Sequence, residues 1–183
     1  IALAQLRRFD EAEALWRRLL NIPGEERAVL PNLGRALDKA GRHDEALQFL
    51  SRAVALAPQD YVARINLAAC LYSLGHFAQS REQNSIASAL QPGIAQPHFN
   101  MGCAWEAELN FARSIACYEQ ALSLELAHQE ATRNRLFLEH FLPEITPQQR
   151  LAHACERGDE ICRGISRMRL PAQRRPGPLR VGL

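Results

Sequence analysis

The sequence lacks long hydrophobic runs and stretches of β-branched residues. Arg, Glu or Asp interrupts every apolar stretch before it reaches the roughly 18 to 20 residues that a membrane-spanning helix needs. Ala, Leu, Arg, Glu and Gln dominate instead, and these residues favour helices over strands. With 47% hydrophobic residues, the chain is also too apolar to be intrinsically disordered. We therefore expect an all-α fold without a membrane span and without a membrane partner.

Signatures of catalysis and of metal binding are missing too. No HExxH, phosphate-loop or GxSxG motif occurs. His153 and Cys155 lie two residues apart on a predicted helix, so their side chains point to different faces, and with His140 and Cys162 they form an irregular set. We expect no catalytic residue, no metal site and no cofactor, and we do not expect this chain to be an enzyme by itself.

The five cysteines form an odd set without CxxC spacing, which predicts neither a disulfide framework nor a zinc ribbon. We expect reduced thiols in a cytoplasmic protein. The five are Cys70, Cys103, Cys117, Cys155 and Cys162.

Positive charge is concentrated at the C-terminal end. The net charge of the chain is +2, but residues 1–149 carry 14 basic and 17 acidic residues, whereas residues 150–183 carry 8 and 3. Arg174, Arg175 and Arg180 lie in a segment punctuated by proline, which we interpret as a solvated linker rather than as a site for phosphate. We therefore expect no nucleic-acid partner.

A period of 34 residues runs through most of the chain. When Arg27 is taken as position 1 of a unit, small residues recur at positions 8 and 20, and positions 4, 7, 11 and 24 are those of large residues, which are Leu30, Leu33, Leu37 and Leu50 in the first complete unit. Small residues let two antiparallel helices approach closely, and the larger ones fill the space between them. Gly at position 15 and Pro at position 32 end the helices. Trp16, Trp105 and Tyr118 fall at positions for large residues, so we expect them in the core.

The period divides the chain into units. We expect three complete helix pairs, preceded by a truncated unit and followed by a single terminal helix of the same type; the ranges are 27–60, 61–94, 95–128, 1–26 and 129–142 respectively. Residues 143–169 form a linker region with a helix over 147–166, where Thr146 is the N-cap and Pro147 the first helical residue. Residues 170–183 are rich in Pro and Arg and lead into the start of a missing domain. We expect both ends to be truncated, and the exposed ends of the stack to self-associate.

This pattern resembles the tetratricopeptide repeat family over residues 1–142. The resemblance implies a right-handed superhelix of helix pairs, in which the first helix of each pair lines a concave groove through positions 2, 5, 6, 9, 12 and 13. Position 6 is an asparagine in every unit: Asn32, Asn66, Asn100 and Asn134. An amide side chain can bond both the C=O and the N–H of an extended peptide. The same side chain could instead bond the backbone of the adjoining repeat, and the sequence leaves both roles open.

Other residues at the groove positions are of mixed chemistry. They are Arg35, Asp38, Ile65, Tyr72, Phe99, Glu106 and Phe137. A carboxylate clamp of the kind that grips chaperone C-termini needs Lys or Arg at positions 2, 5 and 6. Those positions carry no cation in the first three units, which argues against such a partner: they hold Ala28, Pro31, Val62, Ile65 and Gln96 beside the asparagines.

The end of the repeats resembles the junction in bacterial relatives of the protein O-linked N-acetylglucosamine transferases. The matching residues are Asn134, Leu136, Phe137, Phe141, Pro143, Thr146, Pro147 and the Leu179–Gly182 run. Arg135 and Leu183 depart from the family pattern. The resemblance implies that a missing C-terminal part binds a UDP-sugar and glycosylates Ser or Thr, while the repeats hold the acceptor polypeptide.

Three hypotheses for the function follow. The first is the acceptor-recognition region of such a glycosyltransferase, which binds extended polypeptide through Asn66 and Asn100, flanked by Phe99 and Tyr72. The alternative is a stand-alone repeat adaptor that assembles a protein complex. A third is fusion to another catalytic module, such as a sulfotransferase or methyltransferase. The sequence that follows Leu183 discriminates among them.

Overall fold

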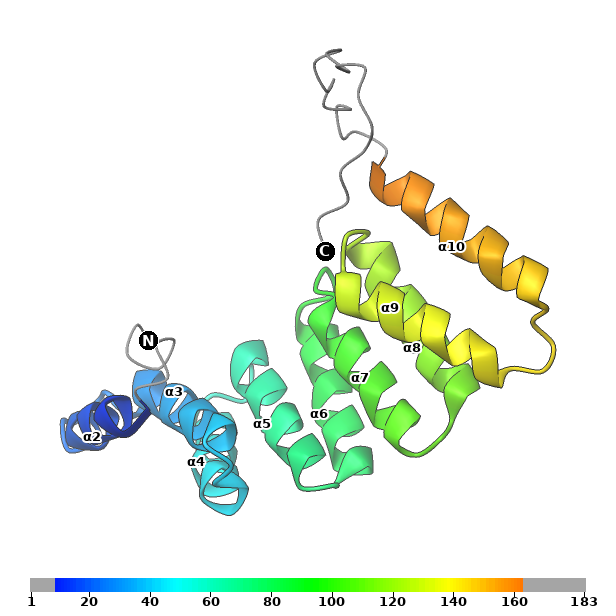
Figure 1. The fold of residues 1–183 in the computed structure, drawn as a ribbon. Helices are drawn as coiled ribbons and strands as arrows, with labels where there is room; N and C mark the ends of the chain where they lie inside the picture. Colours follow the sequence, from blue (N-terminus) through cyan, green and yellow to red (C-terminus); the bar gives the residue numbers. More distant parts are fainter. Residues whose placement is uncertain (1–8, 163–183) are drawn as a thin grey trace, which may run out of the picture.

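The computed structural model describes residues 9–162, which form a row of helices with no strand among them (Figure 1). The helices are α2 (Phe9–Leu19), α3 (Glu26–Lys39), α4 (His43–Leu56), α5 (Tyr61–Ser73), α6 (Phe77–Leu90), α7 (Gln96–Ala107), α8 (Phe111–Leu124), α9 (Gln129–Leu138), the 3-10 turn η1 (Glu139–Phe141) and α10 (Pro147–Cys162). The predicted all-α array of helix pairs is confirmed. The predicted linker and domain start at residues 170–183 lie outside the described residues.

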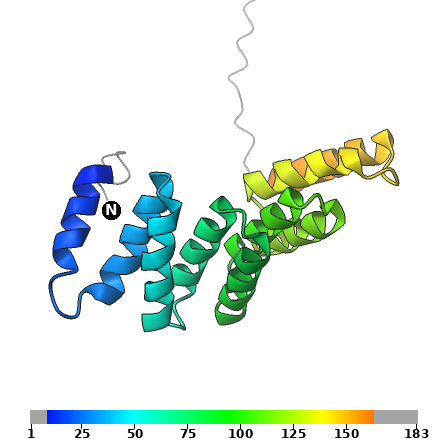
Figure 2. The same cartoon turned by 90° about the horizontal axis from the view of Figure 1, so that it is seen from below.

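Consecutive helices pair and the pairs stack side by side (Figures 1 and 2). We call α3, α5, α7 and α9 the A helices, and α4, α6 and α8 the B helices that pair with the first three. Neighbouring A helices also contact each other directly, α3 with α5 and α5 with α7. Helices α3, α5 and α7 therefore form one continuous side of the row. No helix between residues 9 and 162 combines the length and the apolar character that crossing a membrane requires.

Small residues allow each A helix to approach its B helix closely, as the 34-residue pattern predicts. A Cβ atom on Gly34 would lie 2.5 Å from Leu50 Cγ, and one on Gly102 would lie 2.5 Å from Tyr118 Cε1. At the facing position, the Ser114 hydroxyl donates to the carbonyl of Gly102 at 2.8 Å. At these two glycines even a methyl group would displace the facing side chain.

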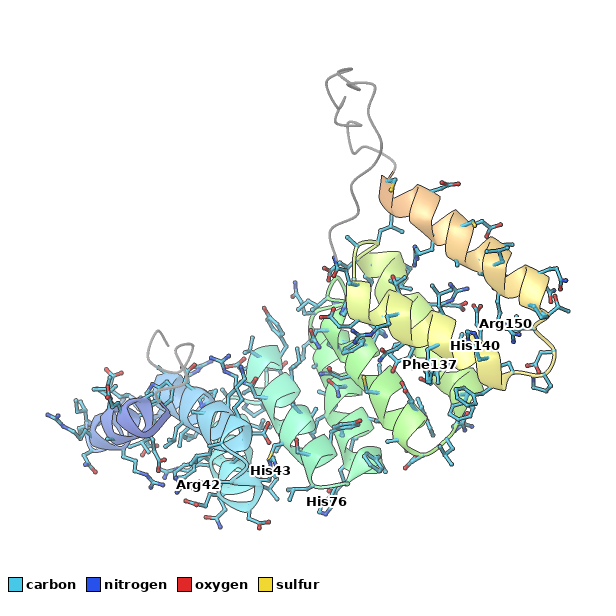
Figure 3. The ribbon with its side chains drawn as sticks, viewed as in Figure 1. Arg42, His43, His76, Phe137, His140 and Arg150 are labelled. Carbon is cyan, nitrogen blue, oxygen red and sulfur yellow. The ribbon has the colours of Figure 1, made fainter. Side chains whose placement is uncertain are left out.

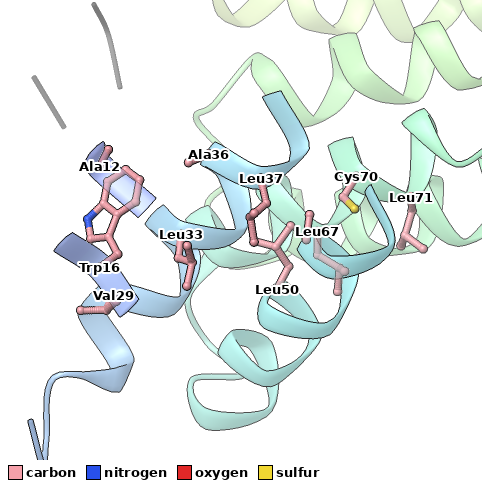
Figure 4. Close-up of a cluster of buried hydrophobic side chains, with 11 residues drawn as sticks. Ala12, Trp16, Val29, Leu33, Ala36, Leu37, Leu50, Leu67, Cys70 and Leu71 are labelled. Carbon is pink, nitrogen blue, oxygen red and sulfur yellow. The ribbon is translucent and has the colours of Figure 1, made fainter. Parts of the chain in front are cut away.

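The core runs from one unit into the next. One cluster joins α2, α3, α4 and α5, and contains Trp16, Leu33, Leu50 and Cys70 among its buried side chains (Figure 4). Trp16 is 6% exposed, so its predicted place in the core is confirmed. Because every pair shares its core with a neighbour, no pair is an independent folding unit.

The two other predicted core aromatics differ from each other. Tyr118 is fully buried, as expected. Trp105 is only half-buried, so its assignment to the core is wrong. The guanidinium of Arg81 lies 3.6 Å from the Trp105 ring centroid and that of Arg113 lies 4.6 Å away. Two cations from neighbouring helices thus cover the ring in place of apolar side chains.

Helix α10 packs differently from the B helices, although it follows α9 as a B helix would. Leu136 and Gln148 occupy positions 8 and 20 of this unit, where the preceding unit has Gly102 and Ser114. The larger side chains prevent a close crossing, and α10 contacts α9 far less than α8 contacts α7.

Polar groups hold α10 instead. The buried carboxylate of Glu139 pairs with Arg135 at 3.0 Å and with His153 at 3.1 Å. Arg150 donates to the carbonyls of Glu139 and Ile145. The predicted cap of α10 is confirmed, since the backbone N–H of Gln149 donates to Thr146 Oγ1 at 3.2 Å.

Candidate peptide-binding groove

The A helices border two clefts that open on the same side of the row. The first cleft lies between α3 and α5, and is lined by Arg27, Ala28, Pro31, Asn32, Arg35, Asp60, Val62 and Asn66. The second cleft lies between α7 and α9, and is lined by Gln96, Phe99, Glu125, Ala127, His128, Gln129 and Glu130. Positions 2 and 5 of a unit contribute to both clefts, so they are parts of one repeated face. We call this face, which carries the positions that the resemblance assigns to a groove, the groove.

The four asparagines at position 6 do not have the same role, and the last two are braces between units. Asn100 Nδ2 donates to Asn84 Oδ1 at 3.2 Å, and its own Oδ1 accepts from Gln96 at 2.8 Å. Asn134 Nδ2 donates to the Tyr118 hydroxyl at 3.2 Å. Asn84 and Tyr118 both stand at position 24 of the preceding unit. A polar side chain at position 24 therefore forms a hydrogen bond with the asparagine 16 residues later, which is then not available to a ligand.

For the first two asparagines, the residue at position 24 of the preceding unit is apolar. Leu50 precedes Asn66, and within residues 9–162 the Asn66 side chain makes no hydrogen bond. Trp16 precedes Asn32, whose Nδ2 donates to the Ala28 carbonyl of its own helix at 2.8 Å. Asn32 Oδ1 and the whole Asn66 amide are thus available to a ligand, and both residues line the first cleft.

The first cleft also carries two arginines, Arg27 and Arg35, that are not paired with a carboxylate of the described residues. Arg27 and Arg35 form no ion pair or hydrogen bond within the described part of the chain. Several arginines elsewhere form ion pairs, as Arg42 does with Glu45 at 2.6 Å. The single carboxylate of the cleft, that of Asp60, accepts from the backbone N–H groups of Val62 and Ala63, because it caps the start of α5. The cleft therefore offers two guanidinium groups and the Asn66 amide N–H to an anionic ligand, and the Asn32 amide oxygen to a peptide N–H.

The remaining predicted groove residues lie in different surroundings and do not share one cleft. Phe99 lines the second cleft, where its ring centroid lies 4.8 Å from that of His128. Glu106 is engaged, because the Tyr118 hydroxyl donates to its Oε2 at 2.6 Å. Tyr72 is 40% exposed, and partial burial raises the pKa of its phenol. Ile65 is half-buried on α5 and lines neither cleft. Of the predicted set, only Asn32, Asn66 and Arg35 share one cleft.

Arg27 and Val62 are groove residues that sequence reasoning missed. Arg27 stands at position 1, just before the positions that the family pattern assigns to the groove. Val62 stands at position 2 and was considered only as a residue that is not basic. The sequence could have indicated Arg27, because it lies eight residues before Arg35 and this spacing places the two cations on one face of a helix.

Three of the cysteines, Cys70, Cys103 and Cys117, are buried or half-buried. Burial raises the pKa of the Cys70 thiol to about 12, and its Sγ lies 3.3 Å from the carbonyl of His43. Burial also raises the pKa of Cys103 and of Cys117. Between residues 9 and 162, no three His, Cys, Asp or Glu side chains come together as metal ligands would.

The repeat geometry agrees with a match to known families. Family models described as tetratricopeptide repeat match residues 1–61 and 37–96, which together are more than half of the chain. The chain belongs to the tetratricopeptide repeat family. The family assignment made from the 34-residue pattern is thereby confirmed.

Relatives of this tetratricopeptide repeat protein include a chaperone organiser. The Hsp70-Hsp90 organizing protein of Triticum aestivum is 30% identical over 96 residues, which are 52% of this chain and 16% of that protein. The chain therefore matches only a small part of that relative.

Two solved structures show the same fold. The crystal structure of MamA has a TM-score of 0.75 at 16% identity, over 88% of this chain and 95% of MamA. The first TPR of Spaghetti (RPAP3), bound to the HSP90 peptide SRMEEVD, has a TM-score of 0.61 at 25% identity. That match covers 66% of this chain and 96% of the Spaghetti domain.

Proposed function

We propose that this chain is a protein interaction module that binds an extended acidic peptide in the first cleft. The observation that supports the proposal is the combination of Arg27 and Arg35, which form no ion pair among the described residues, with Asn32 and Asn66, whose amide groups do not brace neighbouring units. We propose no catalytic role for the chain itself. The proposal corresponds to an adaptor that brings other proteins together.

Each group in the cleft has a distinct part in binding. A guanidinium group forms paired, charge-assisted hydrogen bonds with a carboxylate, so Arg27 and Arg35 would bind the acidic side chains or the terminal carboxylate. The Asn66 amide can donate to a peptide carbonyl and accept from a peptide N–H. Recognition of the backbone by Asn66 tolerates different peptide sequences, and the arginines select for negative charge.

The Spaghetti domain supports this choice of ligand, since SRMEEVD, the peptide bound to it, is acidic at its C-terminal end. The sequence argument against a clamp for such peptides considered positions 2, 5 and 6 alone. In this chain the cations stand at positions 1 and 9 of the first complete unit instead, and they line the same cleft as Asn32 and Asn66. We therefore propose an acidic peptide as the ligand, without assigning the protein that carries it.

Calorimetric titration with the heptapeptide SRMEEVD tests this function. We expect Arg35→Ala to weaken binding about tenfold, and Arg27→Ala to act in the same direction, because each removes charge-assisted hydrogen bonds. Arg18→Ala is the matched control, since Arg18 is exposed on α2, outside the cleft. Absence of binding, or equal affinities for Arg35→Ala and Arg18→Ala, would contradict the proposal.

A second candidate function is the acceptor-binding arm of a protein O-glycosyltransferase. The observation that favours it is the Thr146 cap and the start of α10 at Pro147, which match the junction of that family. The Leu179–Gly182 run lies outside the described residues, so the structure adds nothing there. Sequencing the gene beyond the codon for Leu183 tests this candidate. A two-lobed glycosyltransferase domain would support it, and any other domain would exclude it.

A further inference from the structure

Two cysteines lie on the solvent side of α10. Cys155 and Cys162 are exposed, whereas the other three cysteines are buried or half-buried. Because they are seven residues apart in one helix, their side chains leave α10 on the same side, and their Cα atoms lie about 10 Å apart. A disulfide requires Cα atoms within about 7 Å of each other. The two thiols therefore cannot form a disulfide with each other while α10 is intact.

Helix α10 contacts the repeats through its opposite side. Arg150 donates to the Glu139 carbonyl at 3.3 Å, and His153 pairs with the Glu139 carboxylate at 3.1 Å. Figure 3 shows Arg150 on the side of α10 that faces α9. Cys155 and Cys162 lie about 160° and about 180° around the helix axis from His153. The side that carries the two thiols is therefore turned away from α9.

The two thiols belong to a row of four residues along this side. Leu151, Cys155, Gly158 and Cys162 follow one another at intervals of four, three and four residues, which is the spacing at which two helices pack side by side. We call these four residues the α10 stripe. Leu151 is 66% exposed, and a Cβ atom on Gly158 would meet no atom outside its own helix within 4 Å. The α10 stripe thus has the register of a helix contact, and no described helix covers it.

A second copy of the chain complements the α10 stripe. If two α10 helices run side by side in the same direction about a two-fold axis, each residue of the stripe meets its equivalent. The flanking residues Ala154 and Asp159 then face each other across the contact, so no like charges meet there. Antiparallel helices that align the thiols would instead bring the two Asp159 carboxylates together, and would leave Leu151 opposite a residue beyond 162. The parallel arrangement is therefore favoured.

The cysteines of two such helices lie at the distance of a disulfide. Helices pack about 8 to 10 Å apart, and each Cα atom lies about 2.3 Å from its helix axis, so facing Cα atoms are about 4 to 6 Å apart. This range overlaps the range that disulfides occupy. We propose that Cys155 and Cys162 form a redox site at which two copies of this chain are joined by two disulfides, each between equivalent cysteines. The proposal does not depend on the proposed function, and the joined pair would carry two copies of the first cleft.

The reaction needs an oxidant, which is a low-molecular-weight disulfide such as oxidised glutathione. The Cys155 thiolate of one copy attacks a sulfur of this disulfide, the S–S bond of the oxidant breaks, and the small thiol that leaves takes up the proton that the cysteine has lost. The Cys155 thiolate of the second copy then attacks the cysteine sulfur of the mixed disulfide and releases the second small thiol. Each bridge thus consumes two protein thiols and one small disulfide, and the same exchange at Cys162 forms the second bridge.

Oxidation of the reduced chain with oxidised glutathione, followed by electrophoresis without reductant, tests the proposal. We expect a dimer that dithiothreitol converts back into the monomer. Trypsin separates the two cysteines, because it cleaves after Arg150, Arg157 and Arg163. Mass spectrometry of the unreduced digest should show LAHACER joined to LAHACER and GDEICR joined to GDEICR. If LAHACER joined to GDEICR is the main product, the helices are antiparallel and the proposed site is wrong.

Cysteine variants identify the thiols that react. Cys155→Ser and Cys162→Ser should each still form a dimer through the remaining bridge, and the double variant should stay monomeric. Cys117→Ser is the matched control, because Cys117 is half-buried on α8, and we expect it to form the dimer as the unmodified chain does. A double variant that still forms a disulfide-linked dimer would overturn the assignment.

Variants of Gly158 distinguish a specific contact from random collisions between exposed thiols. Gly158→Lys places two positive charges against each other where the stripes meet, so we expect the dimer to form about tenfold more slowly, although the mixed disulfide with glutathione forms no more slowly. Gly158→Ala keeps a small side chain there and should form the dimer at the rate of the unmodified chain. Circular dichroism checks that both variants are folded. Equal rates of dimer formation for the two variants, or an unmodified chain that stops at the mixed disulfide, would overturn the proposal.

Discussion

Replacing Gly102 by Ala inserts a methyl group where α7 crosses α8. The new Cβ would lie 2.5 Å from Cε1 and 2.7 Å from Cδ1 of Tyr118, closer than packed carbon atoms approach. The tyrosine cannot move away freely, because it is fully buried and its hydroxyl donates to Glu106 and accepts from Asn134. The substitution therefore strains a ring that is fixed at both ends.

The expected magnitude follows from opposing contributions. Overpacking a buried site costs about 1 to 3 kcal/mol, and disturbing the bond from Tyr118 to the Glu106 carboxylate adds about 1.5 to 3 kcal/mol. Ala favours a helix over Gly by about 1 kcal/mol, which offsets part of this cost. We expect Gly102→Ala to lower the free energy of unfolding by about 2 kcal/mol. Urea denaturation followed by circular dichroism measures it.

Gly158→Ala is the matched control. Gly158 also lies inside a helix, α10, but no atom outside its own helix lies within 4 Å of its added Cβ. It receives the same gain in helix propensity without the contact, so we expect unchanged or slightly higher stability. If Gly102→Ala were as stable as Gly158→Ala, the close crossing of α7 and α8 would not limit the size of position 8, and the packing argument would be refuted.

Two further substitutions test the turn and the asparagines. Leu109 has a φ of 59° at position 15, where Gly41 and Gly75 have φ values of 78° and 79°. We expect Leu109→Gly to raise the free energy of unfolding by about 0.5 to 1 kcal/mol, because relief of about 1 to 2 kcal/mol of backbone strain exceeds the added entropy of glycine in the unfolded chain. A lower urea midpoint would disprove this. Asn66→Ala should weaken binding of SRMEEVD about fivefold and change stability by less than about 0.5 kcal/mol, whereas Asn134→Ala should lower stability by about 1 kcal/mol and leave affinity unchanged. Titration and urea denaturation of both variants check this, and the opposite assignment of the two effects would show that the distinction between free and bracing asparagines is wrong.

The positions of the helices could be predicted from the sequence because they depend on local features that repeat. Small residues at positions 8 and 20, together with the residues that end helices, define each pair, and α4, α6 and α8 each span positions 17 to 30 of their units. The loose packing of α10 against α9 could also have been predicted, because Leu136 and Gln148 stand at positions 8 and 20, where the other units have small residues. Sequence reasoning recognised that the repeats end there, but did not derive the altered packing.

The candidate site was less predictable because it depends on pairs of residues in different units. Whether an asparagine is free is decided by the side chain 16 residues earlier, as Leu50 before Asn66 and Tyr118 before Asn134 show. Likewise, the Trp105 ring contacts the guanidinium groups of Arg81 and Arg113, which lie on two neighbouring helices. A period identifies equivalent positions, but it does not show which side chains meet across a stack.

The central claim is that the first cleft, between α3 and α5, binds an acidic peptide. The most direct measurement is NMR titration of the isotopically labelled chain with SRMEEVD, observing the side-chain amide resonances of the four position-6 asparagines. The amides of Asn32 and Asn66 should shift with a single saturating dissociation constant, while that of Asn134 should stay fixed, because it is held by Tyr118. Shifts at Asn134 without shifts at Asn66, or no saturable shift at any of the four, would contradict the account.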